Sequence, residues 1–230
     1  MRYAGIIFDL DGTLLDTIED LGDSMNAVLD RHGFPKFSTE EYKQFVGRGM
    51  RQLAVCALPE SEQSKEKVDF YLAELEEAYG KRWGDKTRAY AGIAELLDTL
   101  EARGMRLFVL SNKPQPFVEE IVDSFFGHGR FALVYGAREG VPKKPDPYSA
   151  REISRISGIA SEQMLYLGDS AVDMQTARAA GMYGVGAAWG FRGKEELWSG
   201  GAQAVIEKPM DLPRILDAPC GSVGNSGAAI

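Results

Sequence analysis

The sequence predicts an α/β protein built on a doubly wound parallel sheet, and three observations carry this prediction. Short apolar runs without polar alternation recur along the chain, as expected of strands that are covered on both faces. Segments with helical periodicity lie between these runs, which is the order typical of parallel sheets. One long stretch, residues 16–88, carries only helical patterns, which predicts a small all-helical unit inserted after the first strand.

The expected strands and helices follow from these patterns in chain order. The apolar runs predict strands at Tyr3–Phe8, Arg106–Leu110, Phe131–Tyr135, Met164–Leu167, Met182–Ala187 and Ala204–Glu207. The helical patterns after the insertion predict helices at Ile93–Arg103, Pro116–Phe126, Pro147–Ser157, Val172–Ala180 and Leu212–Leu216. This alternation predicts a Rossmann-like core.

The inserted unit shows helix start signals but no convincing strand pattern. Asp16 is a candidate cap for its first helix, and Ser38 with Glu41 forms a capping-box pattern for a second. We therefore expect a core made of residues 1–15 and 89–218 and a helical cap made of residues 16–88. The small and polar residues 219–230 are expected to be a disordered tail.

Composition excludes several classes of protein. The chain has 230 residues, of which 44% are hydrophobic and 26% charged, as in ordinary globular proteins. Its net charge of -8 argues against a general nucleic-acid binder. No signal-peptide pattern and no apolar run of membrane-spanning length occur, so we expect a cytoplasmic protein without a membrane partner, either a monomer or a homodimer. The two cysteines form no CxxC motif, and Cys56 is expected in the core.

Four polar motifs follow predicted strands, and the carboxyl ends of parallel strands are where such sheets bind ligands. The motifs are "DLDGT" from Asp9, "LSNKP" from Leu110, "KKPDP" from Lys143 and "GDSAVDM" from Gly168. Each motif alone has a plain structural explanation as a turn or a helix cap. A calcium loop is a poor explanation of the first, because Gly12 stands at its fourth position instead of its sixth.

Together the motifs predict a phosphoryl-transfer site. Several carboxylates at one edge require a cation, and a set of oxygen ligands without His or Cys favours Mg²⁺. A lysine and a hydroxyl beside this ion suit the negative oxygens of a phosphoryl group. One carboxylate can then attack phosphorus and form an aspartyl-phosphate.

The four motifs, in this order, and the helical insertion resemble the haloacid dehalogenase superfamily of Mg²⁺-dependent phosphotransferases, over about residues 3–217. The resemblance implies that Asp9 is the nucleophile and that Asp11 is the general acid and then the base for water. It implies that Mg²⁺ is held by the Asp9 carboxylate, the Asp11 backbone carbonyl and Asp169. Asp173 would hold a metal-bound water or lie just outside the direct ligands.

The same resemblance assigns the phosphate-binding groups. Ser111, with the backbone of Asn112, would bind the transferring phosphoryl group. Lys144 would neutralise the nucleophile and the phosphate, and it is preferred over the adjacent Lys143 because it has the family's Lys-Pro spacing.

Within this superfamily the chain resembles phosphoglycolate phosphatases. Asp11 disfavours a dehalogenase, which has no alcohol to protonate, and the segment around Lys43 is unlike a phosphonatase lysine site. The segment "FVGRGMRQLAVCALP", Phe45–Pro59, resembles the cap of phosphoglycolate phosphatases. We therefore expect hydrolysis of 2-phosphoglycolate. The alternatives are a phosphatase for pyrophosphate or a sugar phosphate, a phosphomutase such as β-phosphoglucomutase, and a non-catalytic phosphate-binding module.

A glycine-flanked arginine in this segment is a candidate for substrate binding. Gly47 and Gly49 allow a tight turn that would point Arg48 at the core. Arg48 could then pair with a substrate carboxylate, whereas the alternative is a solvated arginine at a helix end. The sequence leaves both interpretations open.

Overall fold

Six parallel strands form the central sheet, as the sequence predicts. The computed structural model describes residues 2–217. The strand order is β5-β4-β1-β6-β7-β8, and each neighbouring pair is parallel. The strands are β1 (Gly5–Phe8), β4 (Arg106–Pro114), β5 (Leu133–Ala137), β6 (Met164–Gly168), β7 (Tyr183–Ala187) and β8 (Ala204–Ile206).

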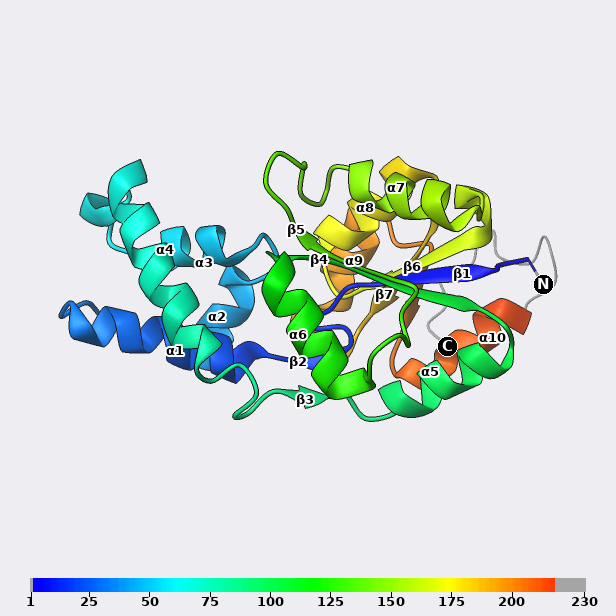
Figure 1. Ribbon diagram of the computed structural model, residues 1–230, viewed down its shortest axis with the longest axis horizontal. Coiled ribbons are helices and arrows are strands. Elements are labelled where there is room, and N and C mark those ends of the chain that lie inside the picture. The colour runs from blue at the N-terminus through cyan, green and yellow to red at the C-terminus, as the bar shows by residue number, and fades with distance from the viewer. Residues whose placement is uncertain (1, 218–230) are drawn as a thin grey trace.

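Helices cover both faces of this sheet (Figure 1). They are α5 (Ile93–Ala102), α6 (Gln115–Phe126), α7 (Tyr148–Ser157), α8 (Ala171–Ala180), α9 (Lys194–Gly200) and α10 (Leu212–Asp217), with short 3-10 turns at η2 (Ser161–Gln163) and η3 (Pro209–Asp211). Side chains alternate across β1, because Ile6 and Phe8 join one buried cluster and Ile7 the other. Helices α5 and α6 contribute to the first cluster, and α7 and α8 to the second. The double cover explains why the strands are apolar without alternation.

Between β1 and α5 the chain forms a helical insertion, which lies beyond one edge of the sheet on the left of Figure 1. Its helices are α1 (Ile18–Arg31), α2 (Thr39–Phe45), α3 (Met50–Ala57), η1 (Glu60–Glu62) and α4 (Lys65–Gly80). The predicted capping box of Ser38 and Glu41 is present at α2. The N-cap of α1 is Thr17 instead of the expected Asp16, although an Asp16 side-chain oxygen still accepts from the Ile18 N–H at 3.4 Å.

Three other expectations need correction. Two short strands, β2 (Leu15–Asp16) and β3 (Arg88–Ala89), pair antiparallel where the chain enters and leaves the insertion. Two-residue strands are too short to produce a sequence pattern. Strand β4 extends to Pro114, because Pro114 pairs with Ala137 of β5. Cys56 is exposed, because it lies on the solvent side of α3.

The remaining expectations about the chain ends are limited by the described range. The predicted tail, residues 219–230, lies outside the described residues. Among residues 2–217, none of the helices has the length and apolar character needed to cross a membrane.

Candidate active site

Three strand ends bring the predicted site residues to one edge of the sheet. Strands β4, β1 and β6 are adjacent and parallel, so their carboxyl ends lie side by side. Asp9 directly follows β1, Ser111 lies in the last part of β4, and Asp169 directly follows β6. This edge faces the helical insertion.

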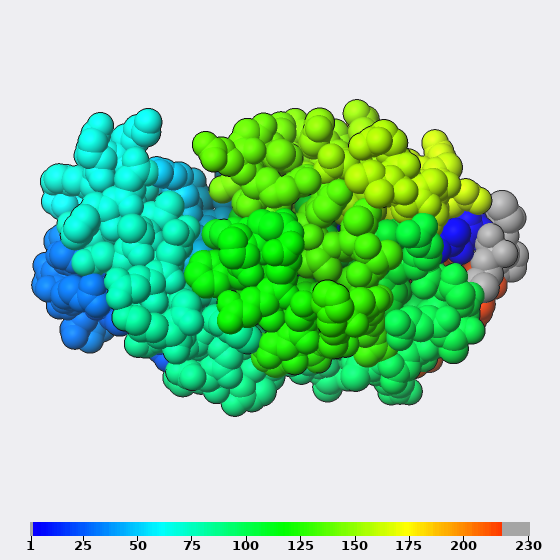
Figure 2. All heavy atoms as spheres, viewed as in Figure 1, coloured from blue at the N-terminus to red at the C-terminus, as the bar shows by residue number. Residues whose placement is uncertain are grey.

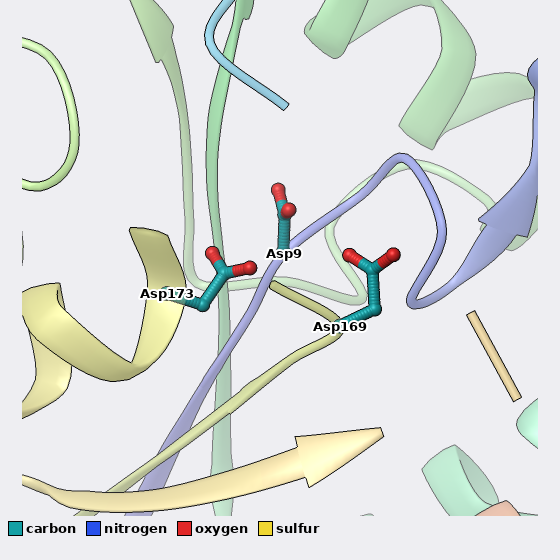
Figure 3. A group of neighbouring side chains, drawn as sticks. All are labelled: Asp9, Asp169 and Asp173. Carbon is teal, nitrogen blue, oxygen red and sulfur yellow. The ribbon is translucent and has the colours of Figure 1, made fainter. Parts of the chain in front are cut away.

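Three buried carboxylates converge at this edge (Figure 3). Oxygens of Asp9, Asp169 and Asp173 all lie within 4.8 Å of one another. Each carboxylate is held by a local donor, because Asp9 accepts from the Leu10 N–H at 2.7 Å and Asp169 from the Phe191 N–H at 2.8 Å. Asp173 caps the start of α8, where it accepts from the Ser170 hydroxyl at 2.6 Å.

Lys144 is the cation that the structure places between two of these carboxylates. Its Nζ lies 2.8 Å from Asp9 Oδ1 and 2.7 Å from Asp173 Oδ1, and its side chain is buried. Burial alone would lower the pKa of Lys144, but the neighbouring Asp173 and Asp9 outweigh burial and hold this pKa well above its usual range. Lys144 is therefore a permanent cation in this site.

One lysine does not offset three carboxylates. Burial, then repulsion from Asp173, raise the pKa of Asp9 to about 7 against the attraction of Lys144. Burial, then Asp173 and Asp9, also raise the pKa of Asp169 well above its usual range. Both shifts come first from burial and then from repulsion among the carboxylates, which the Lys144 ammonium only partly offsets.

This donor set fits a hard divalent cation. The cluster offers carboxylate oxygens alone, which suit Mg²⁺ better than a transition metal. Gly12, which follows β1 and has a φ of +83°, allows the end of β1 to lie close to Asp169 at the end of β6. A Cβ built on Gly12 would lie only 2.2 Å from Asp169 Oδ2, so a side chain at this position would displace Asp169.

Asn112 ties three segments of the site together. Its side-chain Nδ2 donates to the carbonyl oxygens of Gly47 and Lys144, each at 3.1 Å. Its Oδ1 accepts from the Lys144 N–H at 2.9 Å. The side chain of Asn112 therefore fixes both the Lys144 segment and the Gly47 turn of the insertion, a role that the sequence did not reveal.

Asp11 lies two residues beyond Asp9 and has its own set of partners. Its Oδ1 accepts from the Thr17 hydroxyl at 2.7 Å and forms an ion pair with Lys113. Lys113 is buried, and sequence reasoning missed it as a site residue. The available signal was its place in the "LSNKP" motif, directly after Ser111 and Asn112.

A small cavity of about 20 Å³ lies between the core and the insertion. The core lines it with Asp9, Asp11, Ser111, Asn112 and Lys113, and the insertion with Leu21, Val46, Gly47, Gly49, Met50 and Leu53. This volume is close to that of a single water molecule. In Figure 2 the atoms of the insertion abut those of α6, which agrees with a closed arrangement.

Arg48 is placed elsewhere. It is exposed, and it lines a neighbouring hollow of about 390 Å³ together with Ser170 and Arg192. This hollow shares Val46 and Gly47 with the small cavity. Of the predicted turn, Gly47 and Gly49 line the small cavity, whereas Arg48 does not.

Comparison with known proteins gives the class of this chain. Residues 6–187 match the family of haloacid dehalogenase-like hydrolases. A phosphoglycolate phosphatase of Psychrobacter arcticus is 33% identical over 198 residues, which cover 84% of this chain and 86% of that protein. A phosphoglycolate phosphatase of Aliivibrio fischeri is 30% identical, with 84% and 87% covered. A candidate phosphoglycolate phosphatase from Lactobacillus delbrueckii has a crystal structure that aligns with a TM-score of 0.87 and 28% identity, covering 94% of this chain and 99% of that one.

The chain therefore belongs to the haloacid dehalogenase-like hydrolases. Within this family it is a phosphatase, similar along most of its length to the phosphoglycolate phosphatases.

Proposed function

We propose that this protein is a Mg²⁺-dependent phosphatase that hydrolyses small phosphomonoesters, 2-phosphoglycolate above all, through an aspartyl-phosphate on Asp9. One observation carries the proposal. The carboxylate of Asp9 lies 2.8 Å from the Lys144 ammonium and within 4.8 Å of two further carboxylates, in a cavity that Asp11 and Ser111 also line. This combination supplies a nucleophile, a cation and a second carboxylate at one point.

In the first half of the proposed reaction, an Asp9 oxygen attacks phosphorus and the bond from phosphorus to the alcohol oxygen breaks. Asp11 gives its proton to the departing oxygen. The Ser111 hydroxyl, the Asn112 backbone N–H and the Lys144 ammonium donate to the phosphoryl oxygens. The product of this half is the free alcohol and a phosphorylated Asp9.

In the second half, Asp11 removes a proton from water and the water oxygen attacks phosphorus. The bond between phosphorus and the Asp9 oxygen breaks, which returns the carboxylate and releases phosphate. Asp11 is protonated again and ready for the next substrate, so protons balance over the cycle.

Asp9, Asp169 and the Asp11 backbone carbonyl would hold Mg²⁺, with Asp173 beside them. The ion supplies positive charge that offsets the carboxylates and the phosphoryl oxygens. The raised pKa values of Asp9 and Asp169 support this assignment, because both carboxylates lack a sufficient counter-charge from the protein alone. The helical insertion would act as a cap that opens for substrate and closes to exclude water.

The lining of the cavity supports a small leaving group without several hydroxyls. The insertion side of the cavity is apolar apart from its two glycines, and it presents few polar groups to the several hydroxyls of a sugar. The similarity to phosphoglycolate phosphatases supports 2-phosphoglycolate as that substrate.

A screen of phosphate release over about fifty phosphorylated metabolites, including pyrophosphate and sugar phosphates, tests the proposal. We expect the highest kcat/KM with 2-phosphoglycolate, dependence on Mg²⁺, and loss of turnover in EDTA. Release from p-nitrophenyl phosphate without transfer to a second alcohol would exclude a mutase. Absence of release from every compound would contradict the proposed function and favour a non-catalytic module.

A further inference from the structure

We propose that Lys113 is the specificity-determining residue of this site and that it binds an anionic substituent, a carboxylate, on the substrate's leaving group. The proposal rests on the proposed phosphatase function and names the chemistry by which the site selects its substrate. The observation behind the proposal is that Lys113 is buried, lines the cavity and pairs with Asp11.

The lining of the cavity, as described over residues 2–217, offers no other positively charged side chain that could bind a substrate carboxylate. Among the described residues that line the cavity, Lys113 is the one that carries a positive charge. The insertion contributes four apolar side chains and two glycines to the lining, so it offers no charged group to a carboxylate there. A carboxylate brought into this closed space without a cation would have a large desolvation cost.

The geometry leaves Lys113 able to bind a second carboxylate. Its side chain is 2% exposed, and its ammonium pairs with Asp11. The ammonium also lies 4.8 Å from the centre of the Tyr79 ring, which packs against it from α4 of the insertion. An ammonium has three N–H donors, so the contact with one Asp11 oxygen leaves donors for a substrate.

The position of Lys113 also suits the reaction. Because Asp11 is the proposed acid for the leaving oxygen, a substituent bound at Lys113 lies next to the bond that breaks. Thr17 donates to Asp11 Oδ1 at 2.7 Å, the oxygen that Lys113 also contacts, so both partners hold the same oxygen and orient Asp11.

Arg48 is the competing candidate for carboxylate binding. It is exposed and lines the neighbouring hollow with Arg192, and it is not among the described residues that line the cavity containing Asp9. The two assignments predict different effects of substitution, so one experiment separates them.

The experiment compares two substrates that differ in one group, 2-phosphoglycolate and ethyl phosphate, in which a methyl group replaces the carboxylate. The readout is kcat/KM for 2-phosphoglycolate divided by kcat/KM for ethyl phosphate. Comparing this ratio in each variant with the wild-type ratio cancels the difference in intrinsic reactivity between the two esters. We expect Lys113→Met to lower the ratio about 30-fold or more, as the loss of a buried charged hydrogen bond implies. Lys113→Arg should retain most of the ratio, and Lys81→Met, a change at an exposed lysine of α4's C-cap, should leave it unaltered.

Equal losses for both substrates in Lys113→Met would overturn the proposal, because they would indicate a structural role. A collapse of the ratio in Arg48→Ala would overturn it in favour of Arg48. A wild-type protein that releases phosphate but does not prefer the carboxylated ester would overturn it while the phosphatase function stands. No release from any ester would instead contradict the proposed function itself.

A second measurement on the wild-type protein covers the case in which Lys113→Met fails to fold. The non-hydrolysable pair 3-phosphonopropionate and propylphosphonate differs in the same way as the two substrates. We expect the carboxylated compound to inhibit hydrolysis of p-nitrophenyl phosphate at least about 10-fold more strongly. Equal inhibition by the two compounds would overturn the proposal.

Discussion

Two aspartates separated by one residue have different partners, which supports the different tasks that we propose for them. Asp9 contacts the Lys144 ammonium and lies in the carboxylate cluster, whereas Asp11 contacts Thr17 and Lys113 outside it. The sequence motif predicts that both residues take part, but their division of labour depends on residues from β4 and from the Lys144 segment. Lys113 is 102 residues from Asp11 in the chain, and Lys144 is 135 residues from Asp9.

The proposed acid role of Asp11 predicts a dependence on the leaving group. In Asp11→Asn, hydrolysis of an alkyl phosphate should fall by about 10²- to 10⁴-fold, because its alkoxide needs a proton to leave. The formation of phosphorylated Asp9 from p-nitrophenyl phosphate should fall much less, because nitrophenolate leaves unprotonated. Single-turnover release of the two alcohols measures both effects. Equal losses in the two release rates would contradict the acid role.

At the scale of elements, the segment that enters the insertion is fastened to the segment that leaves it. Asp20 of α1 is buried, and one of its oxygens accepts from the Thr87 N–H and hydroxyl at 2.8 Å each. Its two oxygens also accept from the Lys86 N–H at 3.1 and 3.0 Å. These bonds anchor the insertion beside the β2–β3 pair.

Asp20→Ala should lower the free energy of unfolding by about 2–4 kcal/mol, because it leaves buried donors of Lys86 and Thr87 without an acceptor. Asp23→Ala is the matched control on the same helix. It removes a half-exposed ion pair with Lys86 and should cost less than about 1 kcal/mol. Denaturant unfolding measures both, and equal costs would show that Asp20 has no special anchoring role.

A second contact links the core to the insertion, and we propose that it holds the insertion in its closed position. The Arg192 guanidinium, from the loop after β7, donates to the carbonyl oxygens of Gln44 and Val46 at 3.0 Å each. These carbonyls lie at the C-terminal end of α2, where a cation is also favoured by the helix dipole.

Arg192→Ala should therefore favour the open position and raise KM for 2-phosphoglycolate by about 5- to 10-fold, from the loss of these hydrogen bonds. Hydrogen exchange should become faster in α2 while the central sheet stays protected. Arg214→Ala removes an exposed arginine of α10 and serves as the control. Unchanged KM and unchanged exchange in Arg192→Ala would show that this contact does not hold the insertion closed.

Across the whole molecule, most of the core and the meeting of the four motifs could be predicted from the sequence, whereas several other contacts between segments could not. Apolar runs reveal strands such as β6 because both of its faces are buried. The β2–β3 pair has two residues in each strand, which is too few for a pattern. Lys113 was missed because its importance depends on burial beside Asp11 and Tyr79, which its motif alone does not reveal. Arg48 lines the neighbouring hollow and not the cavity, and the glycine pattern around it does not reveal the direction of its side chain.

The charge balance of the molecule predicts how Mg²⁺ affects stability at different pH. The pKa of Asp9 is raised to about 7 from a usual value of 3.8, so the metal-free folded state binds more protons than the unfolded state between these values. Its contribution to stability is therefore present at low pH and is lost as pH rises through this window. Mg²⁺ competes with protons for the carboxylates, so it should raise Tm more at about pH 8 than at about pH 5.

Thermal melts with Mg²⁺ and with KCl at matched ionic strength measure this difference. KCl should reproduce little of the stabilisation, because a monovalent ion does not offset three carboxylates. An equal rise in Tm at both pH values, or an equal rise with KCl, would argue against a metal held by Asp9 and its neighbours.

The most direct test of the whole account is detection of the phosphoryl group on Asp9. Asp11→Asn should accumulate the intermediate from p-nitrophenyl phosphate, since Asp11 also serves as the base that removes it. Acid quenching, followed by mass spectrometry of the peptide that contains Asp9, is the measurement. The account predicts one phosphoryl group on Asp9 in this variant and none when Asp9→Asn is added. If the Asp9→Asn variant released phosphate at the wild-type rate, and no phosphorylated Asp9 were found in Asp11→Asn, the account would be contradicted.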